Sequence, residues 1–248
     1  MKKLIYYELR KIFSKRLAQI AFVGLLILSA VLSLSNYLNK HSSDGISAEG
    51  SGRIAVKIDQ KIAAKYEGIL TDEKIEQMMY DFAPECDLNG INAAYFYQNA
   101  TQSAAFARFS DMNGNWNGSS VSDVFSDEEI RIGYVDGWLS TSKNLPMIFT
   151  ILSLMIIIML APVYSGEYEG IDNIILTSKY GKTKCSTAKA VASILTAVFT
   201  TTVIVDFNLV NSVLLYGKSG LDCSILFAPR VHVENFVPFN ITCGELLN

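Results

Sequence analysis

A lysine between a glycine and a threonine is the first place where residue types and spacing in this sequence suggest chemistry. Gly181, Lys182 and Thr183 match the end of the phosphate-binding loop G-x-x-x-x-G-K-[ST]. In that loop, which follows a strand, backbone N–H groups cradle nucleotide phosphates. Here Leu176 occupies the position of the first glycine, and an uncharged apolar run stands where the strand should be. The sequence therefore predicts no ATP site in this chain.

Side chains that serve acid–base, nucleophilic or metal chemistry are few and widely separated. The two histidines, His41 and His232, fall in separate predicted loops, and no G-x-S-x-G nucleophile motif occurs. Glu167 and Glu169 are two positions apart and would diverge on a helix. We therefore predict that the chain is not an enzyme, with no catalytic residue, no metal site and no cofactor.

The cysteines also lack a recognisable arrangement. Four occur, far apart and without C-x-x-C spacing: Cys86, Cys185, Cys223 and Cys243. This spacing predicts neither a zinc site nor a dense disulfide framework. Cys223 and Cys243 can pair only if both face an oxidising compartment, and the sequence leaves that choice open.

The composition indicates an integral membrane protein. Of the 248 residues, 50% are hydrophobic and 18% charged, and the apolar residues gather in long runs. Runs at residues 17–38, 145–165 and 190–217 have about the 20 residues that one membrane crossing requires. The first is not a typical signal peptide, because it is too long and lacks a cleavage site. The net charge of −3 excludes a generally basic surface for nucleic acid.

Residues 1–16 predict a helix with one apolar side. Ile5, Leu9, Ile12 and Phe13 recur at helical spacing among several lysines and arginines. Such a helix can lie in the headgroup layer as a cytoplasmic elbow. The alternative is a basic flank of the first span, and both interpretations place this end in the cytoplasm.

Residues 39–144 form a polar insert of the size of one small domain, predicted to be mainly helical. Residues 53–82 predict two helices, the second capped by Thr71. Residues 93–109 predict a third helix, and the S-x-x-E pattern from Ser126 to Glu129 predicts a further one leading to Trp138. Tyr134 and Trp138 belong either at the membrane interface or in a core.

The third span carries polar residues within its apolar sequence, namely Asp206, Asn208 and Asn211. Asn208 and Asn211 fall near one helical face, and Asp206 points to a different side. A charge deep in a membrane costs several kcal/mol unless it faces protein or water, so Asp206 is a functional candidate. The alternative is that Asp206 lies near the outer end of the span and is solvated.

Lysines and arginines predict the orientation. They are dense before the first span and in the connector at residues 166–189, and the positive-inside rule places both in the cytoplasm. The insert at 39–144 and the segment at 218–248 then lie outside the cytoplasm. The predicted fold is an all-α, multi-pass plasma-membrane protein, in which three transmembrane helices carry a mainly helical extracytoplasmic domain between the first and second.

This arrangement resembles the permease subunits of ATP-binding cassette transporters of the type-two exporter class. The similar pieces are the amphipathic start KLIYYELRKIFSKR, the segment GYVDGW before the second span, the passage APVYSGEYEGIDNIILTSKYGKTKCSTAKA and the large loop between the first two spans. The resemblance covers most of the chain. Family members usually have six spans, so this chain, with three, resembles the N-terminal half of a permease or a truncated reading frame.

The resemblance implies a role for the connector. In that family the cytoplasmic stretch after the second span contacts a separate ATPase subunit. Carried over to this chain, the contact residues are Glu167, Tyr168, Glu169, Gly170, Gly181 and Lys182. The implied partners are an ATP-binding cassette ATPase, a second permease subunit or a second copy of the chain, and the lipid bilayer, with no nucleic acid.

Two other functions remain open from the residues. One is a membrane-anchored sensor or binding module whose working part is the extracytoplasmic insert. The other is an ion-coupled transporter, which needs several ionisable residues within the membrane; only Asp206 qualifies, so this interpretation ranks last.

Overall fold

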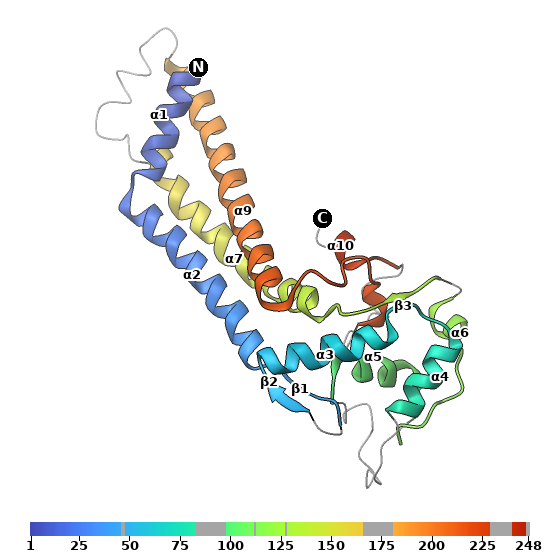
Figure 1. The fold of residues 1–248 in the computed structure, drawn as a ribbon. Coiled ribbons are helices and arrows are strands. Elements are labelled where there is room, and N and C mark those ends of the chain that lie inside the picture. The colour runs from blue at the N-terminus through green and yellow to red at the C-terminus, as the bar shows by residue number, and fades with distance from the viewer. Residues whose placement is uncertain are drawn as a thin grey trace. The chain divides into compact units, whose positions relative to one another are not determined.

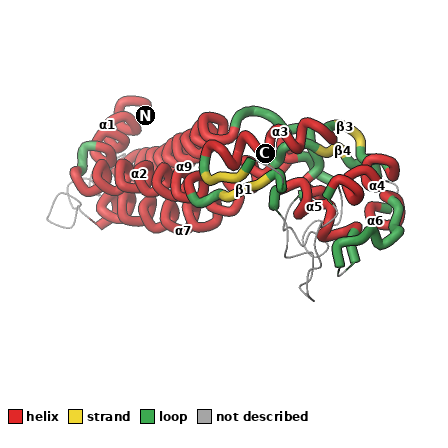
Figure 2. Tube along the Cα trace, turned by 60° about the horizontal axis from the view of Figure 1, so that its bottom comes forward, coloured by secondary structure: helices red, strands yellow, loops and turns green. Residues whose placement is uncertain are grey.

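The computed structural model describes residues 1–45, 48–82, 98–111, 113–126, 128–165, 181–228 and 240–246. The described residues are mostly helical, as Figure 2 shows by colour. They divide into two compact units. Unit 1 comprises Met1–Ser33 and Lys143–Asn211, and unit 2 comprises Leu34–Ser142 and Ser212–Asn248.

Three helices are long and apolar enough to cross a membrane, as the sequence predicted. They are α2 (Arg16–Leu38), α7 (Asp136–Ser165) and α9 (Ser186–Tyr216), labelled in Figure 1. The helix α7 begins nine residues before the predicted start of the second span at 145. Its first turn contains Asp136, whose carboxylate suits a helix N-terminus. The apolar run alone therefore underestimated the length of this helix.

Unit 1 is held together by apolar side chains from four helices. The short helix α1 (Lys2–Phe13) precedes α2, and its Ile12 is fully buried. Ile12 belongs to an apolar cluster that also includes residues of α2, α7 and α9. The buried members of this cluster are Ile12, Ala18, Leu25, Ile148, Leu152, Met155, Met159, Val163, Ala192 and Ile204. The predicted apolar positions Ile5, Leu9 and Phe13 also pack against this cluster.

The outward faces of these long helices remain apolar. Exposed side chains on α2 recur every three or four residues: Leu17, Ile20, Val23, Ile27, Val31, Leu34 and Leu38. A helix that is apolar on its exposed side as well as its buried side suits a lipid environment. The pattern fits the membrane assignment made from composition.

Unit 2 contains three predicted helices of the insert with changed boundaries, α3 (Arg53–Tyr66), α4 (Asp72–Asp81) and α5 (Ala100–Phe109). It also contains the five-residue α6 (Val121–Phe125), which was not predicted. The Thr71 side chain caps α4 by accepting a hydrogen bond from the Lys74 N–H, as predicted. A core of Tyr66, Ile75, Met78, Phe106, Phe109, Ile130 and Phe227, among others, joins these elements.

Short strands depart from the all-α prediction. Strand β1 (His41–Ser43) pairs antiparallel with β2 (Glu49–Ser51), and β3 (Gly68–Ile69) pairs antiparallel with β4 (Arg131–Ile132). Strands of two or three residues are too short to show the alternating pattern by which a strand is recognised.

The predicted helix from Ser126 was wrong. Ser126 ends α6 in the left-handed conformation, with φ of 54°, and its N–H donates to the Ser122 carbonyl. The capping box lies earlier, where Ser120 and Asp123 each bond the other's backbone N–H. Two S-x-x-acid patterns occur in succession, and only the first has a helix after it.

Tyr134 and Trp138 lie in the protein core, which decides between the two predicted environments. Both are buried, and the Trp138 indole N–H donates to the Ser219 carbonyl at 2.8 Å. A buried indole needs such a partner, since an unpaired N–H away from water is costly.

Candidate functional site

Most of the predicted ATPase-contact residues lie outside the described part of the chain. Glu167, Tyr168, Glu169 and Gly170 belong to this group. Gly181 and Lys182 open a π-helical turn, Gly181–Cys185, that leads directly into α9. The structure therefore describes the end of α7, which precedes the connector, and the start of α9, which follows it.

These two helix ends are joined by a hydrogen bond and by close packing. The Tyr164 hydroxyl in the last turn of α7 lies 3.1 Å from the Ser193 hydroxyl near the start of α9. Val163 on α7 and Ala188 and Ala192 on α9 are almost fully buried. Small residues allow helix backbones to approach closely in a membrane. The connector therefore joins two helices, α7 and α9, that pack against each other next to it.

Helix α1 packs at the same end of unit 1. The rings of Phe13 on α1 and Phe199 on α9 meet edge to face, with centroids 5.8 Å apart. The turn between α1 and α2 is tied down by Gln19, whose side-chain amide donates to the Phe13 carbonyl at 2.9 Å. In Figure 1, α1 lies beside the part of α9 that follows the connector.

One face of α9 is buried along its whole length within unit 1. Its residues are spaced by four: Ala192, Thr196, Thr200, Ile204 and Asn208. The hydroxyls of Thr196 and Thr200 donate to the carbonyls four residues earlier on the same helix. The two threonine hydroxyls therefore find their hydrogen-bond acceptors within α9 and need none from a neighbouring helix.

Asn208 is a buried polar residue that links α9 to α2. Its amide oxygen accepts a 2.7 Å hydrogen bond from the Ser29 hydroxyl on α2, and its amide N–H donates to the Ile204 carbonyl at 2.8 Å. Both side chains are buried. Hydrogen bonds of this kind between membrane helices contribute about 0.6 kcal/mol on average and up to about 1.7 kcal/mol.

Asp206 and Asn211 behave differently from Asn208. Asp206 is exposed on the side of α9 that carries Val210, so it does not face the interior of unit 1. Asn211 is half-buried, and its amide nitrogen is buried without a hydrogen-bond partner among the described residues. The three predicted polar residues are therefore not brought together into one site.

Sequence reasoning missed a buried ion cluster in unit 2. The Lys40 ammonium lies 2.5 Å from an Asp59 carboxylate oxygen and also bonds the Asp136 carboxylate. Asp59 is 1% exposed, and its other oxygen accepts from the Ser42 hydroxyl at 2.6 Å and from the Ala100 N–H at 3.2 Å. The cluster ties β1, α3, α5 and the start of α7 to one another.

The electrostatics of this cluster explain why Lys40 keeps its charge. Burial lowers the pKa of Lys40, but the neighbouring carboxylates of Asp136 and Asp59 outweigh this effect, and the pKa lies above its ordinary value. A buried charge is tolerated only when it is paired and hydrogen-bonded. No single segment shows the signal, because the three residues are far apart in the chain.

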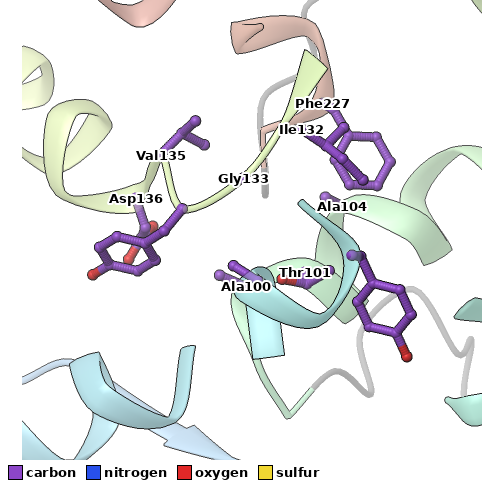
Figure 3. Close-up of a pocket in the computed structure, with 11 residues that line it drawn as sticks. Ala100, Thr101, Ala104, Ile132, Gly133, Val135, Asp136 and Phe227 are labelled. Carbon is purple, nitrogen blue, oxygen red and sulfur yellow. The ribbon is translucent and has the colours of Figure 1, made fainter. Parts of the chain in front are cut away.

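A small cavity lies beside this cluster, within unit 2. Its volume is about 20 Å³, and Figure 3 shows Asp136, Thr101 and Gly133 on its lining together with the apolar Phe227. A water molecule needs roughly 10–15 Å³ measured in this way, so the cavity has space for one. It is too small for an organic ligand.

Tyr134 also lines this cavity and has an unusual hydroxyl. The group is buried without a hydrogen-bond partner among the described residues. Burial is the main cause that raises its pKa, and the charges of Asp136 and Asp59 raise it further. The buried environment of Tyr134 therefore favours its neutral phenol form.

Among the described residues, no group of three or more His, Cys, Asp or Glu side chains can hold a metal ion. The polar contacts described above link α2 to α9 and α7 to α9 in unit 1, and join several elements around Lys40 in unit 2. The chain matches no model of a protein family, no curated protein and no solved structure.

Proposed function

We propose that this chain is a permease subunit of an ATP-binding cassette transporter of the type-two exporter class. In this proposal the chain carries out no ATP hydrolysis itself, and a separate ATPase subunit contacts the connector at residues 166–189. The three membrane-length helices and the family resemblance of the connector support it.

The observation that carries most weight is the packing of α1 at the connector end of unit 1. Ile12 is fully buried, and Phe13 meets Phe199 on α9. An elbow helix beside the connector gives a partner in the cytoplasm two adjacent surfaces to contact. Because Tyr164 links α7 to Ser193 on α9, a push on the connector would move both helices as one body.

The membrane setting of the proposal also involves a second permease subunit or a second copy of the chain. The exposed apolar residues of α2, α7 and α9 must be covered by lipid or by another membrane helix, since water does not wet them favourably. The plasma membrane is the proposed location, with the N-terminus in the cytoplasm.

Co-purification with the ATPase tests the connector directly. The chain is tagged and co-expressed with an ATP-binding cassette ATPase of the same organism, and the amount of ATPase retained in detergent is measured. Glu167→Lys reverses a charge in the predicted contact and should reduce retention severalfold. Glu76→Lys makes the same exchange at an exposed position of α4 and should leave retention unchanged.

Retention that survives both Glu167→Lys and scrambling of residues 167–182 would overturn the contact. The competing sensor hypothesis places the function in the insert, and it predicts that substitutions in the connector leave this function unchanged. It predicts instead that the insert, residues 39–144, binds a specific ligand when it is expressed alone.

A further inference from the structure

Two of the cysteines lie directly opposite each other in unit 2. Ser224 and Thr242 form an antiparallel bridge, flanked by a 3.0 Å hydrogen bond from the Cys243 N–H to the Cys223 carbonyl. On the other side, the Ile225 N–H donates to the Ile241 carbonyl. In this register Cys223 faces Cys243 across the pair.

The geometry of such a pair suits a covalent link. Opposed residues at a hydrogen-bonded position of an antiparallel pair have Cα atoms about 5.5 Å apart, and their side chains share one face. Disulfides join residues whose Cα atoms are roughly 4.4–6.8 Å apart. Both thiols are free in the structure, and their exposed fractions are 2% for Cys223 and 0% for Cys243.

Neither thiol is reactive, although the Cys223 thiol donates to the Asp222 carboxylate at 4.0 Å. Burial raises the pKa of Cys223 to about 11 and that of Cys243 to about 12, with the nearby Cys223 thiol adding to the second shift. The thiolate is the reactive form, so both groups are inert as nucleophiles in the folded domain. The Cys223 sulfur instead packs against Gly133, where an added Cβ would lie 2.7 Å away.

We propose that Cys223 and Cys243 form an intramolecular disulfide. The two thiols lose their hydrogens, and the two electrons and two protons pass to a disulfide oxidant whose own S–S bond is cleaved to two thiols. The exchange takes place while the domain folds, before both sulfurs are buried. In the cell it rests on the proposed function, because only an extracytoplasmic domain meets such an oxidant.

The link would fasten a segment that the core of unit 2 depends on. Between the two cysteines lies a 3₁₀ turn, Ile225–Phe227, and Phe227 is buried in the core with Phe109 and Ile130. The Ser224 N–H donates to the carbonyl of Arg131 in β4 at 2.7 Å. A disulfide across the Ser224 and Thr242 bridge would hold this turn against β4 when its hydrogen bonds open.

The test traps the thiols in cells that make the full chain. Free thiols are blocked with N-ethylmaleimide in denaturant, without reductant, and the cysteine peptides are mapped by mass spectrometry. We expect a peptide pair joined through Cys223 and Cys243, with neither residue blocked until a reductant is added. Cys223→Ser should leave Cys243 fully blocked, whereas the control Cys185→Ser should not affect the pair.

A second arm separates the pairing from the topology. The chain is synthesised without cells, in detergent, with a buffer of oxidised and reduced glutathione present as it folds. A linked pair in this buffer but free thiols in cells would support the pairing and overturn the extracytoplasmic placement. Free thiols in both arms, or a link from Cys243 to Cys86, would overturn the disulfide itself.

Discussion

The Lys40 ammonium lies 2.5 Å from the carboxylate of Asp59, a side chain that is 1% exposed. This contact joins the segment after α2 to the middle of α3. Asp136 bonds the same ammonium, so one cation offsets two acids. Removing the cation would leave both carboxylates without their shared partner.

Lys40→Met should therefore destabilise the protein strongly. Loss of one partner from a buried ion pair typically costs about 3–5 kcal/mol, because the remaining charge is left uncompensated. Denaturant unfolding of the protein in detergent measures the free energy of unfolding. Lys57→Met removes an exposed lysine from α3 and serves as the control, expected to change stability by less than about 0.5 kcal/mol. Equal effects of the two variants would contradict the role of Lys40.

The hydrogen bond between Ser29 and Asn208 should have a measurable coupling energy. We expect about 0.6 kcal/mol, and at most about 1.7 kcal/mol, from a double-mutant cycle with Ser29→Ala and Asn208→Ala. Ser153→Ala is the control for losing a serine hydroxyl, since Ser153 is exposed and its hydroxyl donates to the Phe149 carbonyl of its own helix. Additive effects of Ser29→Ala and Asn208→Ala would show that the bond contributes nothing.

Gly137 is a position where even a methyl group should not fit. A Cβ there would lie 2.4 Å from the Cβ of Tyr216. Gly137→Ala should lower the free energy of unfolding by about 1–3 kcal/mol, as overpacking does. Gly24→Ala is the matched control, since nothing lies within 4 Å of its added Cβ in α2. This control should be neutral or stabilising by up to about 1 kcal/mol, because alanine favours a helix over glycine.

Acid should weaken unit 2 through Asp81. Burial tends to raise the pKa of Asp81, but bonds from the Lys65 ammonium and the Tyr66 hydroxyl, both at 2.6 Å, bring it below the ordinary value of 3.8. A carboxyl with a lowered folded-state pKa stabilises the fold above the unfolded pKa. That stability is lost as the pH falls from 3.8 through the folded value.

Unfolding of wild type and Asp81→Asn should therefore be followed below pH 5. The two proteins should differ in stability at neutral pH and converge toward pH 2. Glu76→Gln, at an exposed position on the same helix, should run parallel to wild type throughout. A constant difference between wild type and Asp81→Asn over this range would contradict the assignment.

Thiol labelling in intact cells tests the side of the membrane on which the connector lies. Cys185 is half-buried in the turn before α9, and a reagent that cannot cross the membrane should modify it only after the cells are opened. All variants in this experiment carry Cys86→Ser, which removes the thiol expected in the insert. Glu76→Cys in this background should label in intact cells. Labelling of Cys185 in intact cells would place the connector outside and exclude contact with an ATPase.

The helices followed from local properties of the sequence. The apolar run at 17–38 gave α2 to within one residue, and Thr71 capped α4 as predicted. These features depend on residues that are neighbours along the chain. The wrong prediction of a helix from Ser126 also relied on neighbouring residues alone. The S-x-x-E pattern is common, and it caps a helix only where a helix follows directly.

The polar face of α9 was predictable only in part. Helical spacing placed Asn208 and Asp206 on different sides, because residues two apart on a helix diverge. It did not say which side is buried. The structure makes that choice by packing Ile204 and Asn208 into unit 1, where Ser29 supplies the partner.

Tertiary structure alone revealed the ion cluster, and it placed Cys223 opposite Cys243, a pairing that the sequence had left open. Lys40 meets Asp136 across 96 positions of the chain, and Cys223 faces Cys243 only because Ser224 pairs with Thr242. Sequence spacing determines what one helix or strand can present to its surroundings. Which distant groups meet depends on how the elements pack, since a buried charge or thiol takes its partner from another segment.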